Sequence, residues 1–127
     1  MATTIYLIRH AEAEGNLYRR IQGHWDGRIT PRGRAQIEAL AERFREAPIR
    51  ALYSSDLQRT IDTAGAILKY HDLELKTTPQ LREVKLGVWE GRPWGDVEYE
   101  MPEQMYCFNH DPDRWNIPDC EPYPDAQ

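Results

Sequence analysis

A histidine with an arginine directly before it, Arg9-His10, follows the short apolar run from Ile5 to Ile8. Residues 2–8 are rich in β-branched and aromatic types, and a polar stretch ends the run, so the sequence predicts a short buried strand. Open α/β sheets place their chemistry at the ends of such strands, where the following loop exposes side chains. An imidazole that stands there beside a fixed cation has the placement of a nucleophile.

A phosphoryl-transfer site at this position needs an imidazole nucleophile, donors for the phosphoryl oxygens and an acid for the leaving group. Arg9 can clamp a phosphate with its planar fork of donors, and Arg59 is expected in the first turn of a helix, whose N–H groups also favour an anion. Glu83 follows the third predicted strand, and a carboxyl group partly buried there can be held protonated as a general acid. Glu90 is the alternative acid.

Three further residues of this kind lie in the long loop between the first strand and the first helix, and loops of that length are often functional. Asn16 and Gln22 can add neutral hydrogen bonds to a phosphate, and Gly23 permits close approach of the backbone. A metal site is not expected, because His10 and Glu12 alternate on an extended segment and no third ligand has suitable spacing. The sequence predicts no cofactor.

Signals of helices and strands alternate along residues 1–95. Thr30 is a good N-cap, Pro31 suits the first helical position, and apolar residues recur at helical spacing until Pro48 ends the helix. A second helix follows the capping residues 54–56, again with its apolar residues on one face. The predicted strands are residues 2–8, 49–53 and 73–77. This βαβαβ order is typical of an α/β sheet.

Length and charge restrict the class of protein. At 127 residues the chain fits one domain, residues 1–127, which is long enough to bury a core. Residues 96–127 hold nine Asp and Glu against a single Lys or Arg, and five of the nine prolines lie there. This stretch reads as an acidic, Pro-rich excursion in which only residues 101–108 could form a short helix. The net charge of −5 argues against nucleic acid as the main partner.

No targeting or membrane signal stands out in the sequence. A charged start followed by an apolar stretch is absent, and no apolar run approaches the length of a membrane span, so a soluble, cytoplasmic protein is expected. Cys107 and Cys120 are expected as free thiols, a disulfide being the less favoured alternative. Four large aromatic residues could line a substrate pocket, although such residues more often report core packing; these are Trp89, Trp94, Tyr106 and Trp115.

Taken in order, these segments resemble the histidine phosphatase superfamily, also called the phosphoglycerate mutase-like or RHG family. The opening segment 9–12 is similar to the family's Arg-His-Gly-Glu, with Ala11 in place of the usual glycine. The stretch 29–36 resembles the family's Leu-Thr-x-x-Gly-x-x-Gln-Ala segment, and residues 54–64 look like its second phosphate-binding segment. The match runs in order from residue 4 to residue 91.

The resemblance implies a three-layer αβα sheet of the phosphoglycerate mutase type and a phosphohistidine mechanism on a small phosphate ester. His10 attacks phosphorus in line, Glu83 protonates the leaving alkoxide, and water then releases phosphate. Segment 81–91 is similar to the phosphatase branch, so a phosphatase is expected first and a phosphoglycerate mutase is the alternative. The residues implied to hold the substrate are Arg9, Asn16, Gln22, Gly23 and Arg59.

The resemblance also exposes a difference. Family members carry a second catalytic histidine after a later apolar strand, and none of His24, His71 and His110 follows an apolar run. The chain is therefore expected to correspond to the N-terminal part of a family member of roughly 200 residues, with an incomplete sheet. The alternative is a catalytically impaired, phosphate-binding chain. Exposed edges of an incomplete sheet predict association between copies, as a homo-oligomer or an aggregate.

Overall fold

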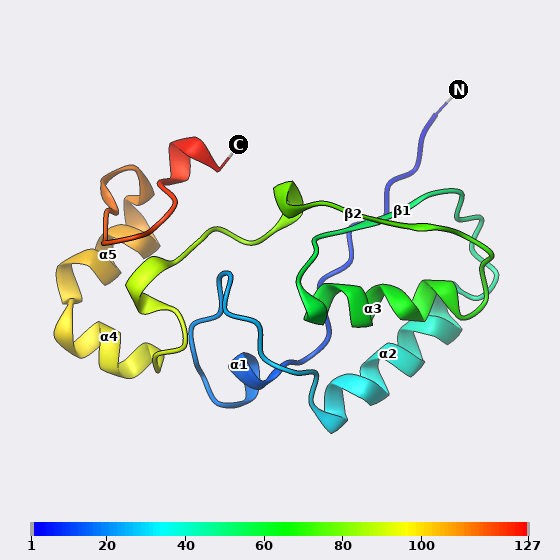
Figure 1. Ribbon diagram of the computed structural model, residues 1–127, viewed down its shortest axis with the longest axis horizontal. Helices are drawn as coiled ribbons and strands as arrows, with labels where there is room; N and C mark the ends of the chain where they lie inside the picture. The colour runs from blue at the N-terminus through cyan, green and yellow to red at the C-terminus, as the bar shows by residue number, and fades with distance from the viewer. Residues whose placement is uncertain (1, 127) are drawn as a thin grey trace.

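The computed structural model describes residues 2–126 as a mixture of helices and short parallel strands, which confirms the predicted α/β class. Figure 1 shows two groups of elements with the short helix α1 (Glu14–Leu17) between them. The first group consists of α2 (Pro31–Phe44), β1 (Leu52–Ser54), α3 (Gln58–Leu68) and β2 (Leu75–Thr77). The second group contains α4 (Trp94–Glu100) and α5 (Pro102–His110).

The long helix α2 begins where its local signals predict. The Thr30 hydroxyl accepts the N–H of Gly33 at 3.0 Å, and a proline occupies the first helical position. Ile37 and Ala41 are buried in one apolar cluster with Ala66 of α3, which is the packing that their helical spacing predicts. Local capping and the periodic stripe together place α2 against α3.

The sheet consists of β1 and β2 paired in parallel, with Leu52 opposite Leu75 and Ser54 opposite Thr77. Helix α3 makes the crossover connection between the two strands, as parallel pairing requires. Figure 1 shows α2 and α3 on the same side of these strands. The strands predicted at 49–53 and 73–77 are present near those positions but are shorter and lie toward the C-terminal ends of the predicted ranges.

The first predicted strand, residues 2–8, is wrong. None of these residues belongs to a strand, and residues 3–10 make no backbone-to-backbone hydrogen bond with any residue that the structure describes. A strand needs a neighbour to satisfy its N–H and C=O groups, and β1 and β2 pair with each other instead. Ile5 and Leu7, which were expected to be buried, are 84% and 98% exposed. The apolar run thus indicates strand propensity without supplying a partner strand.

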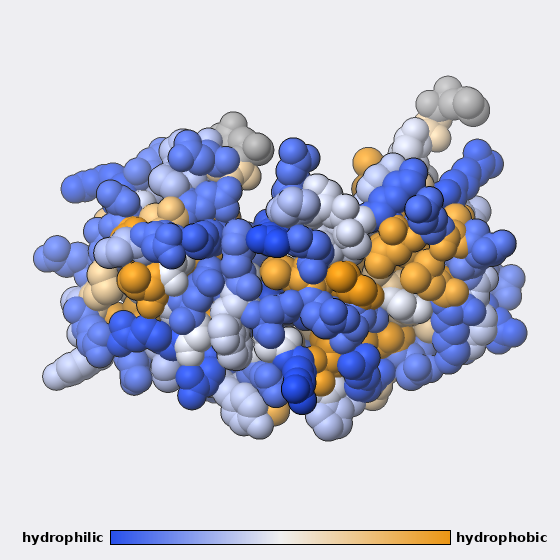
Figure 2. Space-filling view, in the orientation of Figure 1, coloured by the Kyte–Doolittle hydropathy of each residue, from blue (hydrophilic) through white to orange (hydrophobic). Residues whose placement is uncertain are grey.

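An apolar cavity of about 230 Å³ is lined by this unpaired segment on one side and by β1 on the other. Tyr6, Leu7 and Ile8 contribute to it together with Leu52 and Tyr53. Figure 2 shows apolar side chains gathered on this part of the surface, in the half of the molecule that holds the N-terminus. Unpaired backbone beside exposed apolar side chains favours association between copies.

Replacing Leu7 by Lys is expected to raise the monomer fraction of this chain without lowering its melting temperature. The side chain is almost fully exposed, so its loss removes no packing, and a charge on an unpaired edge opposes association. Sedimentation velocity over a range of concentrations measures the effect, with Tyr99→Lys on exposed α4 as the matched control. A wild-type chain that stays monomeric and melts cooperatively at every concentration contradicts this prediction.

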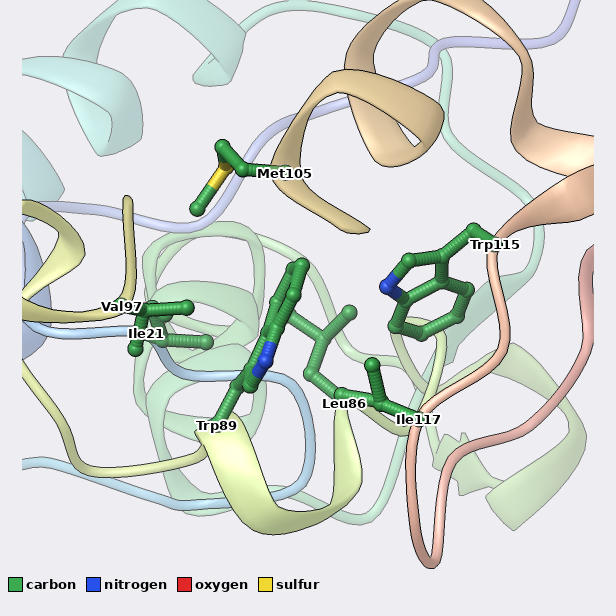
Figure 3. Packing of buried hydrophobic residues seen from close by; sticks show 7 residues of the cluster. All are labelled: Ile21, Leu86, Trp89, Val97, Met105, Trp115 and Ile117. Atoms are coloured by element: carbon green, nitrogen blue, oxygen red, sulfur yellow. The ribbon is translucent and has the colours of Figure 1, made fainter. Parts of the chain in front are cut away.

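The acidic stretch 96–127 folds more completely than predicted. It forms α4 as well as α5, which extends the single short helix expected at 101–108, and short 3₁₀ turns follow. Its helices pack around an aromatic core in which Trp89 and Trp115 are fully buried, as Figure 3 shows. Ile21, Leu86 and Trp89 itself come from outside this stretch. These contacts join residues far apart in sequence, so no periodic pattern in the stretch itself could reveal them.

The aromatic side chains mostly serve this packing. Trp89 and Trp115 lie in the core, Trp94 packs against it and Tyr106 is exposed, so core packing and not the alternative of a substrate pocket describes the three tryptophans among these four residues. Cys107 and Cys120 are free thiols, as predicted. Among residues 2–126, no helix is both long enough and apolar enough to cross a lipid bilayer.

Candidate active site

His10 is half-buried and oriented by the backbone next to it. Its Nδ1 lies 2.7 Å from the carbonyl oxygen of Ala11. A carbonyl oxygen only accepts hydrogen bonds, so Nδ1 carries the proton and the lone pair of the neutral ring is on Nε2. His10 also lines the cavity between the N-terminal segment and β1. The ring therefore presents Nε2 as its nucleophilic atom.

Burial lowers the pKa of His10 below its ordinary value of 6.5. The hydrogen bond to Ala11 and the charge of Glu83 act in the opposite direction, whereas the positive charges of Arg59 and Arg9 lower the pKa further. The imidazole is therefore neutral at pH 7, which is the form that can attack phosphorus. The charges of Arg9, Arg59 and Glu83 therefore all act on His10.

Two helices hold the backbone beside His10 in the absence of a strand partner. The N–H of Ala11 donates to the Thr63 hydroxyl of α3 at 2.9 Å, and that hydroxyl donates in turn to the carbonyl of Arg59 at 2.8 Å. The N–H of Glu12 donates to the Gln36 side chain of α2 at 2.8 Å. Side chains of α2 and α3 thus replace part of a sheet ladder.

The Thr-x-x-Gly-x-x-Gln segment at the start of α2 has a physical role in this arrangement. The Thr30 hydroxyl donates to the Glu12 carboxylate at 2.7 Å, and the N–H of Thr30 donates to the Glu12 carbonyl at 3.1 Å. A Cβ at Gly33 would lie 2.2 Å from that same carbonyl oxygen, so only glycine permits the approach. Thr30, Gly33 and Gln36 therefore dock α2 on Glu12, two residues after the nucleophile.

Arg59 is buried, with 2% of its surface exposed, and its guanidinium holds the loop between α1 and α2. Nη2 donates to the Gly23 carbonyl at 2.7 Å, and Nη1 donates to the Trp25 carbonyl at 2.8 Å. Its Nε is buried and has no hydrogen-bond partner among the described residues. Burial lowers the pKa of Arg59, and the charge of Asp26 opposes this shift most strongly. One donor of a buried cation near His10 is therefore unused.

The N-terminus of α3 was expected to be open to a substrate anion, but the Asp26 side chain already occupies it. Its carboxylate accepts the N–H of Gln58 and, at 3.4 Å, that of Arg59, and it forms an ion pair with the Arg59 guanidinium. Leu57, at the N-cap position, has no side chain that could do this. The chain itself thus supplies the anion that the free N–H groups favour. No sequence pattern marks Asp26 for this role.

The predicted loop ligands differ in what they contact. The Asn16 side chain accepts the N–H of Ala13 at 3.0 Å and so caps α1. Gln22 packs against Gly15, where a Cβ would lie 2.2 Å from its Cγ, and its buried Oε1 has no partner among the described residues. Gly23 adopts a positive φ of 53° and contacts Arg59 through its carbonyl. Gly23 is thus hydrogen-bonded to another predicted site residue, Arg59.

Glu83 is more exposed than the sequence predicts. The partial burial expected for this carboxyl group is absent, because Glu83 is exposed and borders an open cavity of about 490 Å³. Its charge nevertheless raises the pKa of His10 against the effect of burial. The cavity is polar: its lining includes His24, Gln80, Arg82 and Lys85. Arg82 is held there by two contacts of its guanidinium, at 2.6 and 2.7 Å, with the Asp56 carboxylate.

Glu90, the alternative acid, has a different arrangement. Its Oε1 accepts the backbone N–H groups of His24 and Leu86, each at 2.9 Å. Both contacts commit this oxygen to holding the backbone of two segments. Glu83 is therefore the better candidate acid.

Comparison with known proteins identifies relatives over most of the chain. A profile described as histidine phosphatase superfamily (branch 1) matches residues 5–127. A protein of Proteus mirabilis named probable phosphoglycerate mutase GpmB is 44% identical over 88 residues, which are 69% of this chain and 41% of that protein. Its namesake in Yersinia pestis (strain Pestoides F) is 44% identical over 100 residues, 79% of this chain and 45% of that one. The chain spans less than half the length of these relatives.

Solved structures agree with the expected fold. YhfR of Bacillus stearothermophilus superposes with a TM-score of 0.87 at 28% identity, covering 94% of this chain and 59% of that one. The alpha-ribazole phosphatase of Shigella flexneri gives 0.82 at 28% identity, with the same coverage. A mycobacterial glucosyl-3-phosphoglycerate phosphatase in complex with VO3 gives 0.83 at 28% identity, covering 92% and 58%. The phosphoglycerate mutase-like fold is thereby confirmed.

Proposed function

The chain belongs to the histidine phosphatase superfamily, branch 1, and on that premise we propose that it hydrolyses a small phosphate monoester through a phosphohistidine at His10. The observation that carries this proposal is the state of His10. Its Nδ1 proton is fixed on the Ala11 carbonyl, and its pKa is lowered by burial and by two nearby arginines. A neutral ring with Nε2 available, under the influence of the positive charge of Arg59, suits attack on an anionic phosphate.

The proposed reaction has two steps. Nε2 of His10 forms a bond to phosphorus as the bond to the ester oxygen breaks, and Glu83 gives its proton to the leaving alkoxide. Water then attacks the phosphohistidine, Glu83 takes up a proton from it, and inorganic phosphate leaves as the P–N bond breaks. The positive charges of Arg59 and Arg9, both of which act on His10, stabilise the charge on the phosphoryl oxygens.

The polar cavity beside Glu83 supports a small hydrophilic leaving group. Its lining is rich in charged and amide side chains, and Arg82 and Lys85 are already paired with Asp56 and Asp119. The tryptophans that could have accommodated an apolar group are in the core instead. A hydroxylated alcohol therefore fits this cavity better than an apolar one.

A phosphoglycerate mutase is the second candidate, because relatives at 44% identity carry that name. The similarity of segment 81–91 to the phosphatase branch and the phosphatases among the structural neighbours favour hydrolysis. Assays with 3-phosphoglycerate and a bisphosphate primer separate the two: a mutase returns the isomeric monophosphate, whereas a phosphatase releases inorganic phosphate.

The direct test incubates the chain with an aryl phosphate and follows both phenol release and labelled phosphate on the protein. Phosphohistidine is labile to acid and stable to alkali, so the label is expected to show that behaviour. Release of inorganic phosphate together with this label supports the proposal. Vanadate binding without label or turnover instead indicates the impaired, phosphate-binding alternative.

Replacing Glu83 by Gln is expected to slow hydrolysis of an alkyl phosphate by about 10²- to 10⁴-fold and that of a nitrophenyl phosphate far less. An alkoxide leaves only when it is protonated, whereas nitrophenolate leaves without help from an acid. Steady-state rates on the two substrates measure the difference. Equal losses on both substrates remove Glu83 from the role of general acid.

A further inference from the structure

The Glu90 carboxylate connects the two halves of the candidate site. Its Oε1 accepts the N–H of His24, in the loop that contacts Arg59, and the N–H of Leu86, three residues after Glu83. No other described carboxylate accepts backbone donors from both of these segments. Glu90 thus lies between the group that binds phosphate and the group that protonates the leaving oxygen.

A single peptide unit transmits this contact to Arg59. The peptide between Gly23 and His24 donates its N–H to Glu90 at 2.9 Å, and its carbonyl accepts Nη2 of Arg59 at 2.7 Å. The peptide is therefore held between a carboxylate and a guanidinium, an arrangement in which each hydrogen bond polarises the other. The position of the Arg59 guanidinium therefore depends on where Glu90 holds this peptide.

The same loop also contacts the Glu83 segment. Nε2 of His24 donates to the Glu83 carbonyl at 2.9 Å. The room for this arrangement exists only because residue 23 is glycine: a Cβ there would lie 2.5 Å from the Glu90 carboxylate, and the φ of Gly23 is positive. Gly23, His24 and Glu90 thus form one connection between Arg59 and Glu83.

We propose that Glu90 is a positioning residue that fixes Arg59 and Glu83 relative to His10, and that it takes no part in proton transfer. This inference rests on the proposed function, since it assigns Glu90 a role in that reaction. It explains how an exposed segment carrying Glu83 is held at the site without a neighbouring strand. It also predicts that loss of Glu90 affects phosphate binding and chemistry together.

Glu90→Gln keeps an oxygen acceptor but removes the charge, and Glu90→Ala removes both. Both variants are expected to weaken vanadate binding about 10- to 100-fold, the size seen when groups that orient ligating residues are removed. The pKa of His10, followed by NMR, is expected to rise toward 6.5, because Arg59 then lies less firmly beside it. Turnover falls on both substrates, more on alkyl than on nitrophenyl phosphates, whereas Glu83→Gln largely spares the nitrophenyl ester.

Glu14→Gln is the matched control. Glu14 accepts one backbone N–H of the same loop, that of Arg28 at 3.1 Å, a residue whose carbonyl does not accept from Arg59. This variant is expected to keep the wild-type vanadate affinity and His10 pKa. Circular dichroism shows whether each variant is folded. Gly23→Ala, which displaces the Glu90 carboxylate sterically, provides the test if Glu90→Ala does not fold.

The outcomes separate the two proposals. If wild-type protein binds vanadate and Glu90→Gln binds it equally well with an unchanged His10 pKa, Glu90 has no positioning role. If Glu90→Gln loses alkyl turnover and keeps nitrophenyl turnover, Glu90 is the acid and the inference is wrong. If wild-type protein neither binds vanadate nor forms an acid-labile label, the proposed function itself fails.

Discussion

Replacement of His10 by Gln is expected to abolish the acid-labile phosphoprotein and to lower turnover of an aryl phosphate by roughly 10⁴- to 10⁶-fold, the scale on which loss of a covalent nucleophile acts. Glutamine keeps the length and polarity of the side chain but has no nucleophilic nitrogen. The backbone contacts that hold this segment use Ala11 and Glu12, so the fold is expected to persist. Quench-flow labelling and steady-state rates measure both effects.

The control for this variant is His71→Gln. His71 is also partly buried and directs Nε2 at a carbonyl, that of Phe44 at 2.7 Å, but it lies beyond the C-terminal end of α3. Its replacement is expected to change neither label nor turnover. A label that persists in His10→Gln at the wild-type level would falsify the nucleophilic role of His10.

The pH dependence of the wild-type reaction follows from the same residue. Only the neutral ring attacks phosphorus, and burial together with Arg59 and Arg9 lowers the pKa of His10 below 6.5. The acidic limb of kcat/KM is therefore expected to have its midpoint below pH 6.5, as the ring becomes protonated. The NMR titration of His10 should give the same midpoint as the acidic limb of kcat/KM in free enzyme.

The parts of the fold that the sequence predicts are those with local causes. The start of α2 follows from Thr30 and the proline after it, and the α2 and α3 contact follows from apolar residues at helical spacing. The unpaired segment 2–8 shows the opposite case, because strand formation depends on a partner elsewhere in the chain. The aromatic core likewise depends on Ile21 and Leu86, which no pattern within 96–127 could indicate.

The residues of the candidate site also fall into those that the sequence indicates and those that it does not. His10, Arg59 and Glu83 could be named from their types and order along the chain, and the charges of Arg59 and Glu83 both act on the pKa of His10. Asp26 and Glu90 act on backbone N–H groups of distant segments, and such contacts leave no spacing that a sequence reading could detect. The sequence therefore identifies the groups proposed to react, whereas the groups that position them are identified only in the structure.

Arg59→Met is expected to lower vanadate affinity by at least about 100-fold, because it removes the buried guanidinium that the proposal assigns to the phosphoryl oxygens. The same change destabilises the fold by about 3 kcal/mol, since it leaves the Asp26 carboxylate without its cation and the carbonyls of Gly23 and Trp25 without their guanidinium donors. Loss of binding alone could therefore reflect unfolding. The test needs a variant that separates the two effects.

Adding Asp26→Asn to Arg59→Met supplies that separation. The second change removes the unpaired anion while an amide oxygen can still accept an N–H at the start of α3, so part of the lost stability is expected to return in thermal unfolding. Vanadate affinity is expected to stay low in the double variant, because stability and binding depend on different partners of Arg59. The pKa of His10 should rise in both Arg59 variants, since removing a nearby cation makes protonation easier. If vanadate binding returns together with stability, Arg59 holds the loop between α1 and α2 and does not bind the phosphate.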